Sequence, residues 1–117
     1  MSTMRNSVQL IGRPGADPEI KTFDSNSKVA RFRIAVSETR LNANNERVNN
    51  TQWFTVVAWN KMAERVAKVV KKGKRIAIEG ELRNNDWKDN NGVSHSSTEI
   101  WLNDLLVIDW DSNEEGK

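Results

Sequence analysis

The stretch TQWFTVVAWN, residues 51–60, alternates between apolar and polar or small side chains, a pattern typical of a β-strand. One face of such a strand carries Phe54, Val56 and Ala58, and the other carries Trp53, Thr55, Val57 and Trp59. The first set fills a core well. We therefore expect Trp53 and Trp59 on the surface, roughly 20 Å apart at about 3.3 Å per residue, where large aromatic side chains are uncommon.

Four more segments have the composition of strands, and they are residues 6–12, 28–38, 74–83 and 98–109, with a short extension at 19–23. In the segment 28–38, one face is apolar, and Arg31 and Arg33 lie on the other. The polar runs 39–50 and 84–97 are expected to be long loops, with Asn91-Gly92 near the tip of the second.

After Trp59 the apolar residues recur at helical spacing, and they are Ala63, Val66, Ala67 and Val70. Asn60 is expected as the N-cap and Gly73 as the C-cap of this helix. Five strands with one short helix between the third and fourth predict an all-β, five-stranded antiparallel barrel of the OB-fold type. We expect one such domain over residues 1–110 and a short acidic, disordered tail over 111–117.

The composition excludes several kinds of site. The 117 residues contain no cysteine and a single histidine, His95, which we expect to be inert in a solvated turn. The acidic residues are scattered singly, so we expect no enzyme, no metal and no cofactor. No apolar run approaches the ~20 residues that cross a bilayer, and the start MSTMRNSVQL lacks an apolar signal block. These features predict a cytoplasmic protein without a membrane partner.

The net charge of +2 is the sum of two unlike parts. Residues 1–88 hold 17 Lys and Arg against 9 acidic residues, a balance of +8, whereas residues 89–117 hold one Lys against 7, a balance of −6. This division suits a protein that binds a polyanion, but it suits an ordinary solvated surface equally well.

The exposed side of the central strands combines cations with aromatic rings. If the segments 28–38 and 51–59 pair, Arg31 and Arg33 neighbour Trp53 and Trp59. Cations neutralise phosphates and indoles stack on bases of any sequence, so this surface predicts binding of single-stranded nucleic acid. Burial of the two tryptophans in a subunit interface is the main alternative.

Two other tryptophans have different surroundings. Trp87 is flanked by Arg83 and Lys88 in a polar run and extends the same path. Trp101 is expected outside the core with nothing basic around it, in an interface or a surface packing role.

Several stretches resemble one known family, the bacterial single-stranded DNA-binding proteins. They are NSVQLIGR (6–13), GADPE (15–19), FRIAV (32–36), WFTVVAWNKMAE (53–64), KKG (71–73) and EGELR (79–83), in the order of the family and within about residues 5–108. The resemblance implies an OB-fold core, usually a homotetramer with a dimer also possible. It also implies a protein that coats single-stranded DNA during replication, recombination and repair.

The resemblance also implies roles for individual residues. Trp53, Trp59 and Trp87 fall on the stacking aromatics of the family, and Lys61, Lys72 and Arg83 fall on basic positions along the DNA. Arg40 stands where relatives often have an aromatic residue, and its planar guanidinium can stack on a base. The full candidate set is Trp53, Trp59, Trp87, Arg31, Arg33, Arg40, Lys61, Lys72, Arg83 and Lys88.

Two departures from the family pattern affect binding and partners. Asn85 and Asp86 stand where relatives are frequently basic, which indicates weaker or more salt-sensitive binding. The sequence ends in DSNEEGK, without the acidic tip through which relatives recruit repair and replication proteins, so such recruitment is in doubt. The alternatives are a dimeric OB protein of replication restart, an OB subunit with a purely structural role, and an RNA-binding protein.

Overall fold

The computed structural model describes residues 5–108, so the expected tail at 111–117 lies outside the described residues. Its elements are β1 (Val8–Pro14), β2 (Glu19–Thr22), β3 (Lys28–Leu41), β4 (Arg47–Trp59), α1 (Lys61–Val69), β5 (Ile76–Lys88) and β6 (Ser94–Val107). No helix among the described residues is both long and apolar enough to cross a membrane.

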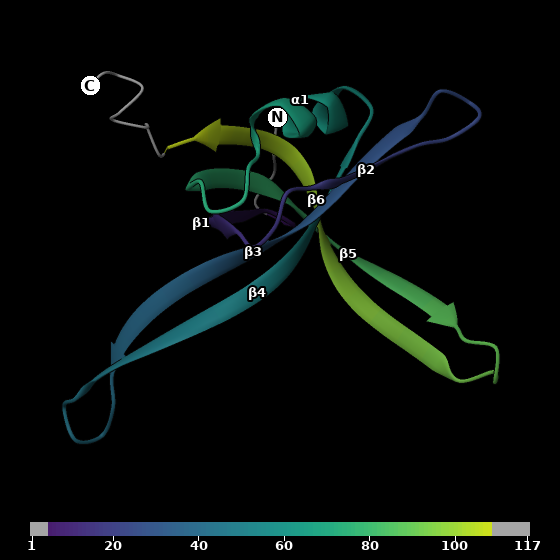
Figure 1. The fold of residues 1–117 in the computed structure, drawn as a ribbon. Coiled ribbons are helices and arrows are strands. Elements are labelled where there is room, and N and C mark those ends of the chain that lie inside the picture. Colours follow the sequence, from purple (N-terminus) through teal and green to yellow (C-terminus); the bar gives the residue numbers. More distant parts are fainter. Residues whose placement is uncertain (1–4, 109–117) are drawn as a thin grey trace, which may run out of the picture.

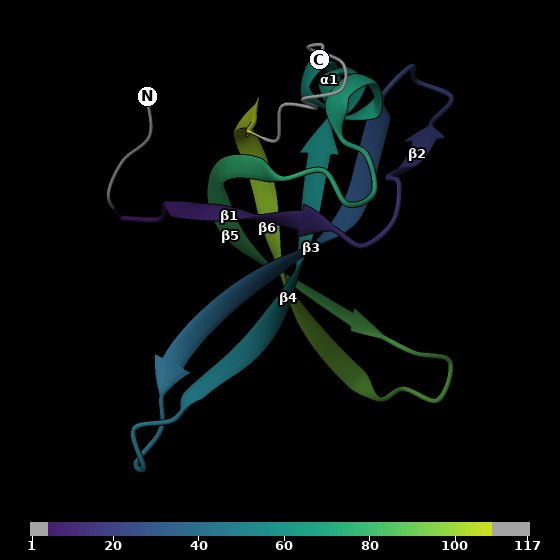
Figure 2. The same ribbon diagram turned by 60° about the vertical axis from the view of Figure 1, so that its left-hand side comes forward.

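The strands form one sheet that closes on itself as a barrel (Figures 1 and 2). Their order is β1-β5-β6-β4-β3-β2, and Arg13 and Pro14 of β1 close the barrel by pairing with β3. The expected OB-type barrel, with one short helix before the last two strands, is therefore confirmed. One pairing differs from the expectation, because β4 and β6 run parallel, with Val56 opposite Ile100. The crossover through α1 and β5 makes this direction possible.

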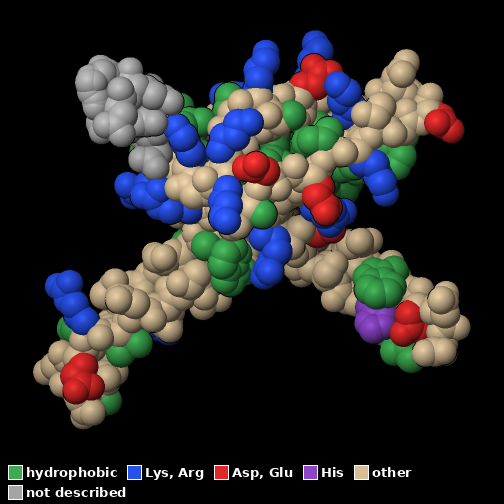
Figure 3. Space-filling model, in the orientation of Figure 1, with side chains coloured by type: hydrophobic (Ala, Val, Ile, Leu, Met, Phe, Trp, Pro, Cys, Tyr) green, Lys and Arg blue, Asp and Glu red, His purple; other side chains and the backbone are tan. Residues whose placement is uncertain are grey.

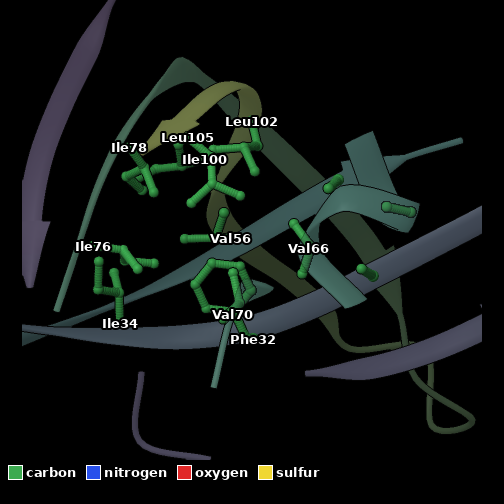
Figure 4. Packing of buried hydrophobic residues seen from close by; sticks show 13 residues of the cluster. Phe32, Ile34, Val56, Val66, Val70, Ile76, Ile78, Ile100, Leu102 and Leu105 are labelled. Carbon is green, nitrogen blue, oxygen red and sulfur yellow. The ribbon is translucent and has the colours of Figure 1, made fainter. Parts of the chain in front are cut away.

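The interior of the barrel is filled by aliphatic side chains and one phenylalanine, as Figure 4 shows. Its largest contributors are Phe32, Ile34, Val56, Val66, Val70, Ile76, Ile78, Ile100, Leu102 and Leu105. The alternation of β3 and β4 predicted this face correctly. Phe54, which was expected in the core, is half-buried and packs at its margin.

Helix α1 lies over one end of the barrel and buries Ala63 and Val66 (Figure 1). Its ends differ from the expectation. Asn60 makes no side-chain cap, and its Oδ1 instead accepts a hydrogen bond from the backbone N–H of Lys28 at 3.1 Å. The helix already ends at Val69, so Gly73 (φ 81°) lies in a later turn and not at the C-cap. Ala67, expected on the apolar stripe, is exposed.

The largest correction concerns the two polar runs that were expected to be loops. Residues 39–41 and 47–50 continue β3 and β4, and residues 84–88 and 94–97 continue β5 and β6. The strands therefore extend beyond the barrel as two hairpin arms, which diverge on the side away from α1 (Figures 1 and 2). The expected tip of the second arm is confirmed, with Gly92 at φ 80° and its N–H bonded to the carbonyl of Asp89.

Candidate nucleic-acid interface

The register of the strands defines one continuous outer face that runs across the sheet and along the β5–β6 arm. Opposite residues on this face are Lys21, Val29 and Trp59 in one row and Arg31, Val57 and Trp101 in the next. Along the arm, Glu81 lies opposite Trp101, Arg83 opposite Glu99, and Trp87 opposite His95. The tryptophans of β4 and the tryptophan of the arm therefore belong to the same side of the sheet.

Trp53 and Trp59 are exposed, as predicted, with 46% and 40% of their surface accessible. The guanidinium carbon of Arg33 lies 5.1 Å from the ring centroid of Trp53, within the range of a cation–π contact. The indole also packs on the backbone of Gly15, where a Cβ atom would lie 2.7 Å from its Cζ3. Strand β3 and the β1–β2 connection thus hold the ring of Trp53 in place.

Trp101 is the functional candidate that the sequence missed, because the expectation of a non-basic environment is wrong. The guanidinium carbon of Arg83 lies 4.6 Å from its ring centroid. On β4, the ring of Trp59 lies 5.9 Å from that of Trp101, tilted by 56°. A chain of two aromatic rings and a cation therefore connects the barrel face to the β5–β6 arm. The register of β6 between β4 and β5 produces this chain, and no local sequence signal encodes that register.

Arg31 is paired with a buried carboxylate. Its Nη1 donates a hydrogen bond to Glu99 Oε2 at 2.6 Å, and Glu99 is 6% exposed. The other oxygen of Glu99 accepts a hydrogen bond from Trp101 Nε1 at 3.5 Å. Val57 lies between Arg31 and Trp101 in the same row, and it is 1% exposed although it faces outward. Arg31 therefore supports the face as well as carrying charge on it.

The β5–β6 arm carries Trp87, which is 49% exposed. One face of its indole stacks on the ring of His95, with centroids 4.3 Å apart and planes 18° from parallel. His95 Nε2 lies 3.0 Å from Asp89 Oδ2. His95 is thus in strand β6, not in a turn, and Figure 3 shows the histidine on this arm. The hydrogen bond from His95, with smaller contributions from the backbone N–H groups of Val93 and Asn91, lowers the pKa of Asp89 from its ordinary value of 3.8.

The remaining candidate cations lie in separate places. Arg40 is on the β3–β4 arm, opposite Val48, and alternation puts it on the other face of the ladder from Trp53. Lys61 is the first residue of α1, and Lys72 follows the helix, where its backbone N–H bonds to Asp17 at 2.9 Å. Lys88 lines a hollow beside Trp87. Most of the Lys and Arg side chains visible in Figure 3 lie on the body of the barrel.

The described residues, 5–108, contain no group of three or more His, Asp or Glu that could hold a metal ion. The outer face presents exposed aromatic rings and guanidinium groups. Flat π surfaces at Trp53, Trp59 and Trp87 suit unstacked bases, and the neighbouring guanidinium groups suit phosphates.

Comparisons with known proteins point to one family. The model of the single-strand binding protein family matches residues 5–108. The chain is 40% identical over 117 residues to a single-stranded DNA-binding protein of Rhizobium meliloti, covering 95% of the chain and 67% of that protein. It is 31% identical over 103 residues to a single-stranded DNA-binding protein of Neisseria meningitidis, covering 88% of the chain and 59% of that protein.

A solved structure supports the same relationship. A chain of the Plasmodium falciparum SSB complex with ssDNA superposes with a TM-score of 0.84 and 32% sequence identity. The match covers 93% of this chain and 99% of that one. Sequence and structure agree over the entire barrel, so the chain belongs to the single-strand binding protein family.

Proposed function

We propose that the protein binds and protects single-stranded DNA without regard to base sequence, in replication, recombination and repair. The observation that carries this proposal is the single outer face on which Trp53, Trp59 and Trp87 are exposed, with Arg33 beside Trp53. In the solved complex of Plasmodium falciparum, a related chain is bound to ssDNA.

The geometry suits a binding mode based on stacking. Every base has a π face, so a base that stacks on Trp53 or Trp59 contributes about 1–3 kcal/mol whatever its identity. Arg33 holds a positive charge next to the first of these rings. Phosphate contacts of this kind release counterions, so affinity falls steeply as salt rises. Duplex DNA keeps its bases stacked on one another and cannot use the tryptophans.

The test is a titration with oligo(dT) that follows the intrinsic tryptophan fluorescence. We expect quenching at low salt, weaker binding as salt is raised, and much lower affinity for duplex DNA of equal length. The absence of quenching would indicate a purely structural OB subunit, and equal affinity for the duplex would refute the stacking mode. An oligo(rU) titration compares RNA with DNA.

We further propose that the protein acts in the cytoplasm as a binding protein and not as a catalyst.

We also propose a homotetramer, with a dimer as the alternative. Strand β1 pairs with β5 along one edge, but its other edge meets β3 only at Arg13 and Pro14, within the described residues. An open edge of this kind suits pairing with a second copy across a two-fold axis. Beside it, a hollow of about 620 Å³ is lined by Ile11 and Leu106, which are 49% and 63% exposed. Light scattering at micromolar concentration tests this, and a mass near 13.4 kDa would count against it.

A further inference from the structure

The outer face continues past Trp59 onto the β2–β3 hairpin, where another aromatic side chain is exposed. Trp59 lies opposite Val29, and Val29 lies opposite Lys21, so the three form one row across β4, β3 and β2. Phe23 directly follows the last residue of β2, lines the same hollow as Lys21 and Trp59, and is 42% exposed. The indole of Trp59 therefore lies at the β4 end of the row, and the phenyl ring of Phe23 lies beyond its β2 end.

A hollow of about 550 Å³ lies along this row. Its lining residues are Glu19, Ile20, Lys21, Phe23, Val29, Arg31 and Trp59. The volume is within the range of small-molecule binding sites, and the lining combines two aromatic rings with two cations. Glu19 lies opposite Arg31 in the next row of the face, whereas Lys21 lies near Phe23, with its Nζ 6.0 Å from the ring centroid. The end of the hollow near Phe23 thus combines an aromatic ring with the positive charge of Lys21.

The backbone of Phe23 is held by hydrogen bonds on both sides. Its N–H donates to the carbonyl of Ser27 at 2.8 Å, and its carbonyl accepts from the N–H of Asn26 at 2.9 Å. Asn26 has a φ of 69°, a left-handed conformation that asparagine tolerates well in tight turns. The ring is therefore presented from an ordered turn and next to a cation, which is the arrangement already seen for Trp53 and Arg33.

We propose that Phe23 and Lys21 form a further nucleotide subsite, in which a base stacks on Phe23 and its phosphate lies against Lys21. This subsite rests on the proposed function. It lengthens the path of the DNA, because it would bind the nucleotide next to the one that stacks on Trp59. The occupant is a single-stranded nucleic acid, since the hollow is continuous with the Trp59 platform and carries the cation that a phosphate requires.

The experiment compares four variants of the whole chain: Phe23→Ala, Phe23→Trp, Lys21→Gln and Thr22→Ala. Thr22 is the matched control because it is exposed, adjacent and on the opposite face of β2. Titrations use oligo(dT) of increasing length at several salt concentrations. For lengths that reach the hairpin, Phe23→Ala should weaken binding by roughly 5- to 30-fold, and Phe23→Trp should restore it. Lys21→Gln should lower the salt slope by about 0.7. Thr22→Ala should bind as the wild type does.

The possible results separate the subsite from the proposed function. If the wild type binds oligo(dT) and Phe23→Ala matches Thr22→Ala at every length, the subsite is refuted and the function stands. If the wild type does not bind oligo(dT) at all, the proposed function itself fails. If Phe23→Ala changes the mass in light scattering while each protomer binds normally, the hollow is a contact between copies, which also overturns the subsite.

Discussion

Arg31 on β3 is joined to Glu99 on β6 by a 2.6 Å hydrogen bond that crosses the outer surface of β4. Two arginines that alternate on one strand therefore differ in role. Arg33 lies over Trp53, and no ion pair of Arg33 is found within residues 5–108. Its charge is available to a phosphate, whereas the charge of Arg31 is largely balanced by a buried carboxylate.

This difference predicts that alanine substitutions at the two arginines separate binding from stability. Arg33→Ala should lower the salt slope of oligo(dT) binding by about 0.7 and leave the melting temperature nearly unchanged. Arg31→Ala leaves the carboxylate of Glu99 with one weak partner and should cost about 1–3 kcal/mol of folding stability. Thermal melts and titrations at several salt concentrations measure both effects. Equal melting temperatures for the two variants would contradict the supporting role of Arg31.

We expect Trp53→Ala and Trp59→Ala to reduce affinity for oligo(dT) by about 1–3 kcal/mol each. Both side chains are substantially exposed, so the cost in folding stability should be much smaller than for a core residue. Phe32→Ala is the control, since it empties a core site on the adjacent strand and should cost about 3–5 kcal/mol. If either tryptophan variant melts as early as Phe32→Ala, its side chain serves packing and not DNA.

Gly15 offers a way to move the ring of Trp53 without removing it. A Cβ atom at this position would lie 2.7 Å from Cζ3 of the indole, so the ring must move from its present position. We expect Gly15→Ala to weaken oligo(dT) binding several-fold while the fold is retained. The same substitution at Gly92 would strain its left-handed backbone but meets no atom within 4 Å, so it should leave the surroundings of Trp53 unchanged. A wild-type affinity in Gly15→Ala would show that the ring position is unimportant.

The contact between Asp89 and His95 predicts a specific effect of acid. Because the pKa of Asp89 is lowered, its contribution to the tip is present above its ordinary value of 3.8 and is lost as pH falls through the lowered value. In a carboxyl NMR titration, Asp89 should titrate below 3.8, and His95→Ala should move the midpoint up toward that value. An unchanged midpoint in His95→Ala would mean that the histidine does not set this pKa.

The proposed oligomer depends on the apolar row beside the open edge of β1. Ile11 lies opposite Ala77, and Ala77 lies opposite Leu106. We expect Ile11→Glu to place a charge in this contact and shift the mass in light scattering toward that of one protomer, with little effect on the core. Thr22→Glu, at an exposed position on β2 outside this hollow, is the control for added charge. A mass unaffected by Ile11→Glu would place the contact elsewhere.

The barrel could be predicted from the sequence because alternation is strong where one face of a strand is buried. The buried residues stand two positions apart, Phe32 and Ile34 on β3 and Val56 and Ala58 on β4. This period identified both the core and the exposed side of Trp53. The arms could not be predicted in this way. Around Asn49 and Asn85 both faces of the ladder are exposed and most residues are polar, so these asparagine-rich strands have the composition of loops.

The contacts of the site depended on register between distant strands. That Arg83 would lie over Trp101, and that Glu99 would hold Arg31, follows from the positions of β5 and β4 beside β6. These residues are up to 68 positions apart in the sequence, so no local pattern indicates them. The stacking of Trp87 on His95 likewise required the ladder of the second arm.

Because the two arms project beyond the barrel, the length of the surface proposed to bind DNA can change without a change in the barrel. Each arm is a ladder outside the core, so its length can change without altering the packing of the interior. The side-chain period of two restricts such changes. Adding two residues to each strand of the β5–β6 arm would carry Trp87 about 6.6–6.8 Å further out on the same face. Adding one would turn its indole to the opposite side. Protein engineering could thus set the footprint on DNA in discrete steps, with arm length as the variable.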